Sequence, residues 1–119
     1  MGPSEEKTAE TFPKSKRILD RRNFRRVYDG GKKYHAKHFI AFVSRNDTGE
    51  SRIGITVTRK TGKSVDRNRS RRLVREVFRK NKWRVPAGID IVINVKRDLA
   101  EAGFDELEKD FLTFLERSR

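Results

Sequence analysis

The chain has 119 residues, a formal net charge of +13 and no cysteine. This length is enough for one compact domain, and the lack of cysteine excludes disulfides, thiolate zinc sites and cysteine nucleophiles. The sequence has no run of about 18 apolar residues and no apolar signal region at its N-terminus, so we expect a cytoplasmic protein.

The positive charge is concentrated in two blocks. Residues 12–37 carry a net charge of +8 and residues 59–84 carry +10, whereas residues 85–119 carry −3. A surface that serves only solubility mixes its signs along the chain. Two basic blocks on one small domain therefore indicate a polyanionic partner, with nucleic acid favoured over an anionic membrane surface.

The N-terminal segment is polar and lacks periodicity. We expect residues 1–11 to be a disordered tail that could include residues left from cloning. Residues 12–119 are then a single folded domain.

A short helix is predicted to begin after Asp20, which is a good N-cap residue. Gly30 and Gly31 are expected to end this helix in the left-handed conformation. Three aromatic or aliphatic residues follow the spacing of one helical face: Phe24, Val27 and Tyr28.

Four segments have the pattern of strands: residues 34–36, 38–45, 51–58 and 89–95. The first of these is a short edge strand. In the second, Phe39 and Phe42 should point to opposite faces of the sheet. The last reads IDIVINV, which is largely apolar and predicts a central strand.

Two further helices are predicted. Ser64 is expected to cap a helix that runs to about Lys82. Residues 104–116 form the second helix, with one apolar stripe: Phe104, Leu107, Phe111, Phe114 and Leu115. The order of helix, two or three strands, helix, strand and helix is typical of an α+β sandwich with helices covering a sheet of about four strands.

Residues 67–75 read RNRSRRLVR and contain five arginines. On a helix, one side gathers Leu73, Val74, Val77 and Phe78. The opposite side gathers Asn68, Arg71, Arg72, Arg75 and Arg79. Arginine pairs with phosphate through two hydrogen bonds, and the like charges four residues apart would destabilise a lone helix. We therefore interpret this face as a polyphosphate-binding surface.

The arginine helix has two other interpretations. A solvated charged face is disfavoured, because few acidic residues are near enough to balance the arginines. A helix-turn-helix is possible, since a basic helix can enter a DNA groove. A strand and a Gly-containing loop, however, precede this helix where that motif needs a short companion helix.

Aromatic residues accompany the first basic block. Phe24, Tyr28 and Phe42 could stack with the bases of a single strand while basic residues track its backbone. The alternative is that they belong to the core. His35 and His38 have no obvious carboxylate partner, and the sequence has no known catalytic or metal-binding motif, so no protein active site is predicted.

These residues carry a resemblance. The segment RKTGKSVDRNRSRRLVREVFR (59–79) resembles the signature of the bacterial ribonuclease P protein subunit, with its Arg-Asn-Arg core at residues 67–69. Residues 12–33 are similar to the N-terminal pattern of that family, and RIGITVTRKTG and IDIVINV fall at the expected spacings. The resemblance covers about residues 12–117. It implies the fold described above, with a left-handed β-α-β crossover.

The resemblance also implies a division of labour. A catalytic RNA would remove the 5′ leader from precursor tRNA with magnesium ions bound mainly by RNA, while the protein alone would be inactive. Eight residues would bind the RNA subunit: Lys60, Lys63, Arg67, Asn68, Arg69, Arg71, Arg72 and Arg75. Three would bind the leader: Phe24, Tyr28 and Phe42. No catalytic residue, protein metal site, membrane or obligate protein partner is implied.

Two alternatives stay open at this point. One is a ribosomal or chaperone-like RNA-binding protein without a nuclease partner. The other is a nuclease that needs no RNA subunit.

Overall fold

The computed structural model describes residues 21–57 and 62–118. The elements follow the predicted order: α1 (Arg21–Gly30), β1 (Lys32–His35), β2 (Phe39–Arg45), β3 (Arg52–Thr56), α2 (Ser64–Asn81), the 3₁₀ turn η3 (Lys82–Arg84), β4 (Ile89–Val95) and α3 (Leu99–Arg117). The predicted α+β class is confirmed. The expected tail and the Asp20 cap lie outside the described residues.

The strands form one sheet in the order β1-β2-β4-β3. β2 is antiparallel to both β1 and β4, whereas β3 and β4 pair in parallel. The predicted central position of β4 is therefore confirmed. Because α2 connects the two parallel strands, β3, α2 and β4 form the expected β-α-β unit, and its left-handedness stays a prediction.

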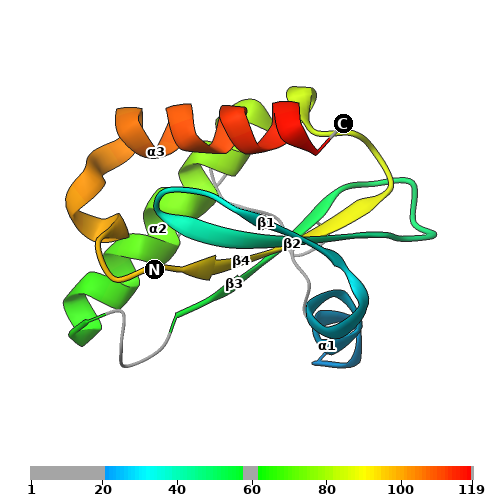
Figure 1. Ribbon diagram of the computed structural model, residues 1–119, viewed down its shortest axis with the longest axis horizontal. Coiled ribbons are helices and arrows are strands. Elements are labelled where there is room, and N and C mark those ends of the chain that lie inside the picture. The colour runs from blue at the N-terminus through cyan, green and yellow to red at the C-terminus, as the bar shows by residue number, and fades with distance from the viewer. Residues whose placement is uncertain (1–20, 58–61, 119) are drawn as a thin grey trace, which may run out of the picture.

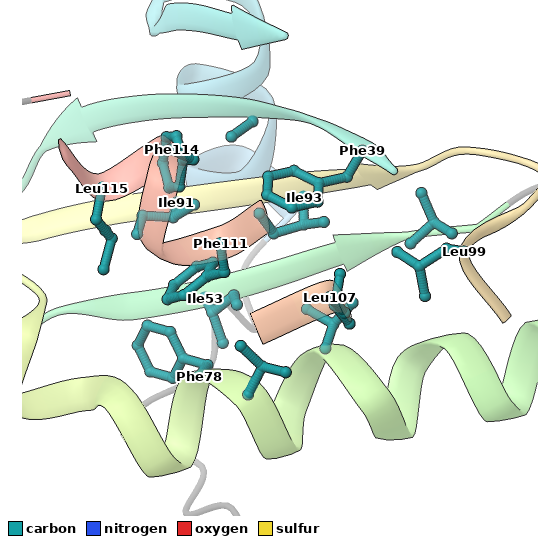
Figure 2. Packing of buried hydrophobic residues seen from close by; sticks show 14 of the residues in the cluster. Phe39, Ile53, Phe78, Ile91, Ile93, Leu99, Leu107, Phe111, Phe114 and Leu115 are labelled. Atoms are coloured by element: carbon teal, nitrogen blue, oxygen red, sulfur yellow. The ribbon is translucent and has the colours of Figure 1, made fainter. Parts of the chain in front are cut away.

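Helices cover both faces of this sheet (Figure 1). α2 and α3 pack on one face, where Phe39 of β2 and Ile91 and Ile93 of β4 belong to the main core (Figure 2). α1 packs on the other face, where Val27 meets Phe42 and Val92. Alternate residues of β2 and β4 thus enter different cores, as the period of a strand requires. The predicted opposition of Phe39 and Phe42 is confirmed.

The starts of α2 and α3 differ from the prediction. Lys63, with extended backbone, precedes the first turn of α2 and makes no side-chain cap bond, so the predicted Ser64 cap is wrong. Ser64 lies inside the helix and accepts a hydrogen bond from Arg67. α3 begins at Leu99 rather than at residue 104, and Gly103 (φ 80°, ψ 175°) kinks it. The apolar stripe on which the prediction depended, from Phe104 to Leu115, lies wholly after this kink, so the prediction gave the longer part of α3 and missed its first turn.

The predicted left-handed stop of α1 is also wrong. Neither Gly30 nor Gly31 has a positive φ. Gly31 instead lies where the chain passes close to β2: a Cβ there would collide with the carbonyl oxygen of Val27 and lie 2.9 Å from that of Val43. Glycine is needed at position 31 because the chain passes close to β2 there, not because its backbone is left-handed.

Candidate nucleic-acid interface

The apolar side of α2 faces the sheet and α3, and its arginine side faces outward. Its buried residues are Ser70, Val74, Val77, Phe78 and Asn81. On the opposite side, Asn68 and Arg72 are exposed, and Arg71 and Arg75 are half-buried. Leu73, expected on the apolar side, is half-buried against the edge of the core. The predicted separation of apolar and basic faces is confirmed.

Local hydrogen bonds orient part of this arginine face. Arg71 Nη1 donates to Asn68 Oδ1 at 3.2 Å, one helical turn away. Arg67 Nη2 donates to Ser64 Oγ at 3.1 Å, so its guanidinium lies against the first turn of α2. A guanidinium has five N–H donors, and these contacts therefore orient the groups while leaving capacity for a phosphate. Asn68 therefore positions a neighbouring arginine.

Arg69 has a structural contact that the sequence did not reveal. Its Nε donates to the carbonyl oxygen of Ala100 at 3.1 Å, which ties α2 to the first turn of α3. Beside it lies a hollow of about 370 Å³ lined by Arg69, Arg72, Leu73 and Glu76. Arg69 therefore joins two helices at the edge of the arginine face.

The carboxylate of Glu76 is held by the next turn of the same helix. Arg79 donates to both of its oxygens, and this hydrogen bonding, with the charges of Arg79 and Lys80, lowers the pKa of Glu76 although burial acts to raise it. Glu76 is therefore a fixed anion within the basic face.

The two predicted lysines lie at the start of α2. Lys63 is exposed at the N-cap position, next to the amide groups that begin the helix. Such a helix start favours phosphate. Lys60 lies outside the described residues.

The three predicted aromatic residues meet on the α1 face of the sheet. Tyr28 stacks on Phe42 with ring centroids 4.5 Å apart and an angle of 23° between the planes. Asn94 Nδ2 donates to the hydroxyl of Tyr28 at 3.4 Å. Phe24 packs, half-buried, against the same small core. Sequence and structure agree that these side chains gather at one place.

Tyr28 and Phe42 differ in how much ring they expose. Tyr28 is 39% exposed, whereas Phe42 is 8% exposed and belongs to the core with Val27 and Val92. Lys33 Nζ lies 5.9 Å from the centre of the Phe42 ring. The surface thus has an accessible tyrosine supported by a buried phenylalanine, with a lysine beside them. Tyr28 offers the larger area for stacking a base.

A buried carboxylate beneath α1 was missed by the sequence reasoning. Asp90 of β4 is fully buried and accepts hydrogen bonds from Arg26 Nη2 at 2.8 Å and Asn46 Nδ2 at 2.7 Å. Arg52 of β3 binds both of its oxygens, at 2.8 and 2.7 Å. One carboxylate therefore connects α1, the β2–β3 turn and β3. The available signal was a single acidic residue inside the apolar run IDIVINV.

The two histidines have different environments. His38 is 3% exposed, with Nδ1 3.4 Å from Asp98 Oδ1 and Nε2 3.5 Å from Glu106 Oε2. The expectation that it lacks carboxylate neighbours is wrong, because Glu106 of α3 and Asp98, just before α3, supply them from far along the chain. Asp110 also accepts the His38 backbone N–H at 2.8 Å. His35 is exposed on β1.

Within residues 21–57 and 62–118, no group of three or more histidine and acidic side chains is placed to hold a metal ion. None of the helices in these ranges is both long and apolar enough to span a bilayer.

Comparison of sequences points to one family. A family model described as Ribonuclease P matches residues 12–119. The ribonuclease P protein component of Syntrophus aciditrophicus (strain SB) is 50% identical over 86 residues, covering 72% of this chain and 72% of the relative. That of Thermotoga maritima is 38% identical over 109 residues, covering 91% of this chain and 90% of the relative.

Solved structures agree with this result. The RNase P protein from Thermotoga maritima is similar with a TM-score of 0.76 and 36% sequence identity, covering 85% of this chain and 96% of that one. The RNase P protein of Staphylococcus aureus has a TM-score of 0.79 at 24% identity, covering 89% of this chain and 97% of that one. At that identity the likeness shows the fold alone.

Proposed function

The chain belongs to the bacterial ribonuclease P protein family, and we propose from this that it binds two RNAs at once, through two different surfaces. It is a protein component of ribonuclease P, so its partner is the RNA of that complex and its role is in tRNA processing. The finer assignment is that α2 grips the RNA subunit while the α1 face holds the single-stranded 5′ leader of precursor tRNA.

The placement of the two surfaces on one sheet carries this proposal. α2 packs on one face of the sheet with its arginines outward. On the other face, Tyr28 of α1 stacks on Phe42 of β2. One rigid sheet can therefore hold two strands of RNA at a fixed spacing. Phosphate pairing suits the arginine face, and base stacking suits the tyrosine.

The chemistry is assigned to the RNA subunit. Within the described residues, Asp90 is held by two arginines and Glu76 by a third, so neither carboxylate is available as a general base. We place magnesium on the RNA subunit and the substrate, and we expect the protein alone to be inactive. The protein contributes by binding and orienting the leader, which lowers the entropy cost of bringing the leader to the reaction centre.

Reconstitution tests this function. A precursor tRNA is incubated at low magnesium with a bacterial ribonuclease P RNA, with this protein, or with both. We expect release of the intact leader and mature 5′ end only when both are present. Cleavage by protein alone would instead support a protein-only nuclease.

The same experiment addresses the alternative of a ribosomal or chaperone-like RNA-binding protein. The comparisons do not favour it, since both relatives compared above are ribonuclease P protein components. Tight binding to ribonuclease P RNA with no stimulation of cleavage would revive it. A cytoplasmic location stays a prediction.

A further inference from the structure

Trp83 lies in η3, immediately after the arginine helix, and projects from the surface. It is 73% exposed, although it is the only tryptophan of the chain. Single exposed apolar residues are common and by themselves indicate nothing. The backbone and the charges around Trp83 are what indicate a binding role.

The turn that carries Trp83 is anchored on both sides. Asn81, which precedes it, is buried and donates to Val77 O at 2.9 Å and to Glu108 Oε2 at 2.8 Å. Val85, which follows, is buried in the main core, and its N–H donates to Lys82 O at 3.1 Å. Between these two anchors, the side chains of Lys82, Trp83 and Arg84 are exposed. The indole is therefore presented on a fixed backbone, which reduces the entropy lost on binding.

The two chain neighbours of Trp83 are basic, and one of them covers the indole. The guanidinium of Arg84 lies 4.3 Å from the centre of the Trp83 ring, covering one side of it. Lys82 and Arg84 are both exposed, and the sequence has no acidic residue between Glu76 and Asp90. An apolar protein partner would have to desolvate these cations. A nucleotide satisfies both features, because its base can stack on indole while its phosphate pairs with the cations.

We propose that Trp83, with Lys82 and Arg84, forms a stacking platform for an unpaired nucleotide of the RNA subunit. This inference rests on the proposed docking of α2 on that RNA. Trp83 follows the C-terminal end of this helix, whose last residue, Asn81, lies about 20 Å along the axis from Asn68. The platform would thus extend the contact of α2 by one further anchor at its far end. The leader surface, by contrast, lies across the sheet.

Tryptophan emission reports on this contact directly, because no other tryptophan contributes. The protein is titrated separately with the RNA subunit, with precursor tRNA and with mature tRNA, and quenching by acrylamide is measured in each complex. We expect the RNA subunit to quench the emission and to protect the indole from acrylamide. Quenching by precursor tRNA alone would overturn the assignment to the RNA subunit.

Substitutions measure the contribution to binding. Trp83→Leu should weaken RNA-subunit binding about 5- to 100-fold, the range expected for one stacked base, and Trp83→Phe should recover part of the loss. Thr113→Ala is the control, since Thr113 is exposed on α3, outside the proposed docking surface. We expect this control to change the affinity less than twofold. Circular dichroism of each variant verifies that the fold is retained.

Wild-type affinity, measured by filter binding without use of the tryptophan, separates the two proposals. If the wild type does not bind the RNA subunit, the proposed function fails. If it binds but Trp83→Leu binds equally well, the platform is refuted and the proposed function stands. An emission change that depends on protein concentration without RNA would refute the platform in favour of contact between two copies of the chain.

Discussion

The guanidinium of Arg26 on α1 reaches the buried carboxylate of Asp90 on β4, with 2.8 Å between Nη2 and Oδ2. The same carboxylate oxygen lies 2.7 Å from Arg52 Nη2 on β3. Arg26 also donates to Ser44 Oγ and to the carbonyl oxygen of Arg45 on β2. The helix that carries Tyr28 is thus fixed to the sheet by polar contacts as well as by Val27.

Asp90→Asn should lower the free energy of unfolding by about 3 kcal/mol, because it leaves a largely buried Arg52 without its carboxylate. Arg26→Met should cost less, since the side chain of Arg26 is 42% exposed and that of Arg52 is 17% exposed. Urea unfolding followed by circular dichroism measures both. Asp47→Asn, an equal change of charge in the exposed β2–β3 turn, is the control. A loss as large for Asp47→Asn would contradict a specific role for Asp90.

Tyr28→Ala should weaken binding of precursor tRNA to the assembled complex by about 5- to 100-fold and leave mature tRNA nearly unaffected. The accessible ring of Tyr28 makes this variant preferable to Phe42→Ala. Phe42 is 8% exposed, so its truncation should also destabilise the fold, by about 3 kcal/mol. Fluorescence-labelled substrates with and without a leader measure the difference. Equal losses for both substrates would refute the assignment of Tyr28 to the leader.

Arg71→Ala combined with Arg75→Ala should weaken binding of the RNA subunit and flatten its salt dependence. Each lost phosphate contact removes roughly 0.7–0.9 from the slope of log K against log salt. Affinity is measured at four or more salt concentrations. Lys109→Ala with Arg117→Ala removes the same charge from α3 and is the control. If the control changes the slope equally, net charge and not the arginine face determines binding.

The sequence predicted the fold well where one periodicity decided it. The period of two in β2 placed Phe39 and Phe42 on opposite faces, and the helical period of α2 separated its arginines from Val74 and Val77. These predictions succeed because local geometry alone determines which way such side chains point.

Predictions failed where distant segments meet. Asp90 is contacted by Arg26, which lies 64 residues earlier on α1. The carboxylates next to His38 belong to Asp98 and to Glu106 of α3. Periodicity contains no information on such partners, which depend on strand order and helix placement. The outward position of the α2 arginines was predicted from the sequence, and their role in binding RNA stays a prediction. The burial of Phe42 and the link from Arg69 to α3 required the tertiary structure.

Gly31→Ala should destabilise the protein by about 1–3 kcal/mol, because the new Cβ must displace the carbonyl groups of Val27 and Val43. Gly30→Ala is the matched control: no atom lies within 4 Å of a Cβ there, and its φ is not positive. It should be neutral or stabilise by up to about 1 kcal/mol, since alanine restricts the unfolded chain. Thermal unfolding of both variants measures the contrast. Equal effects would show that crowding at Gly31 is relieved by movement of α1.

Glu76 should make a small contribution to the free energy of unfolding, and this contribution should depend on pH. Its pKa is lowered from the ordinary value of 4.5, chiefly by the hydrogen bond from Arg79, so the folded state favours the anion. The contribution to stability is therefore complete above the unfolded pKa and is lost as the pH falls through the lowered folded value. With a side chain 40% exposed, Glu76 should contribute no more than about 0.5 kcal/mol. Wild type and Glu76→Gln are compared by urea unfolding at a series of pH values from 7 downwards. They should differ most at pH 7, and the difference should shrink as the pH falls. Arg79→Gln, made in wild type and in Glu76→Gln, completes a double-mutant cycle. If the stability difference between wild type and Glu76→Gln persists in acid, the new amide and not the lost charge perturbs α2.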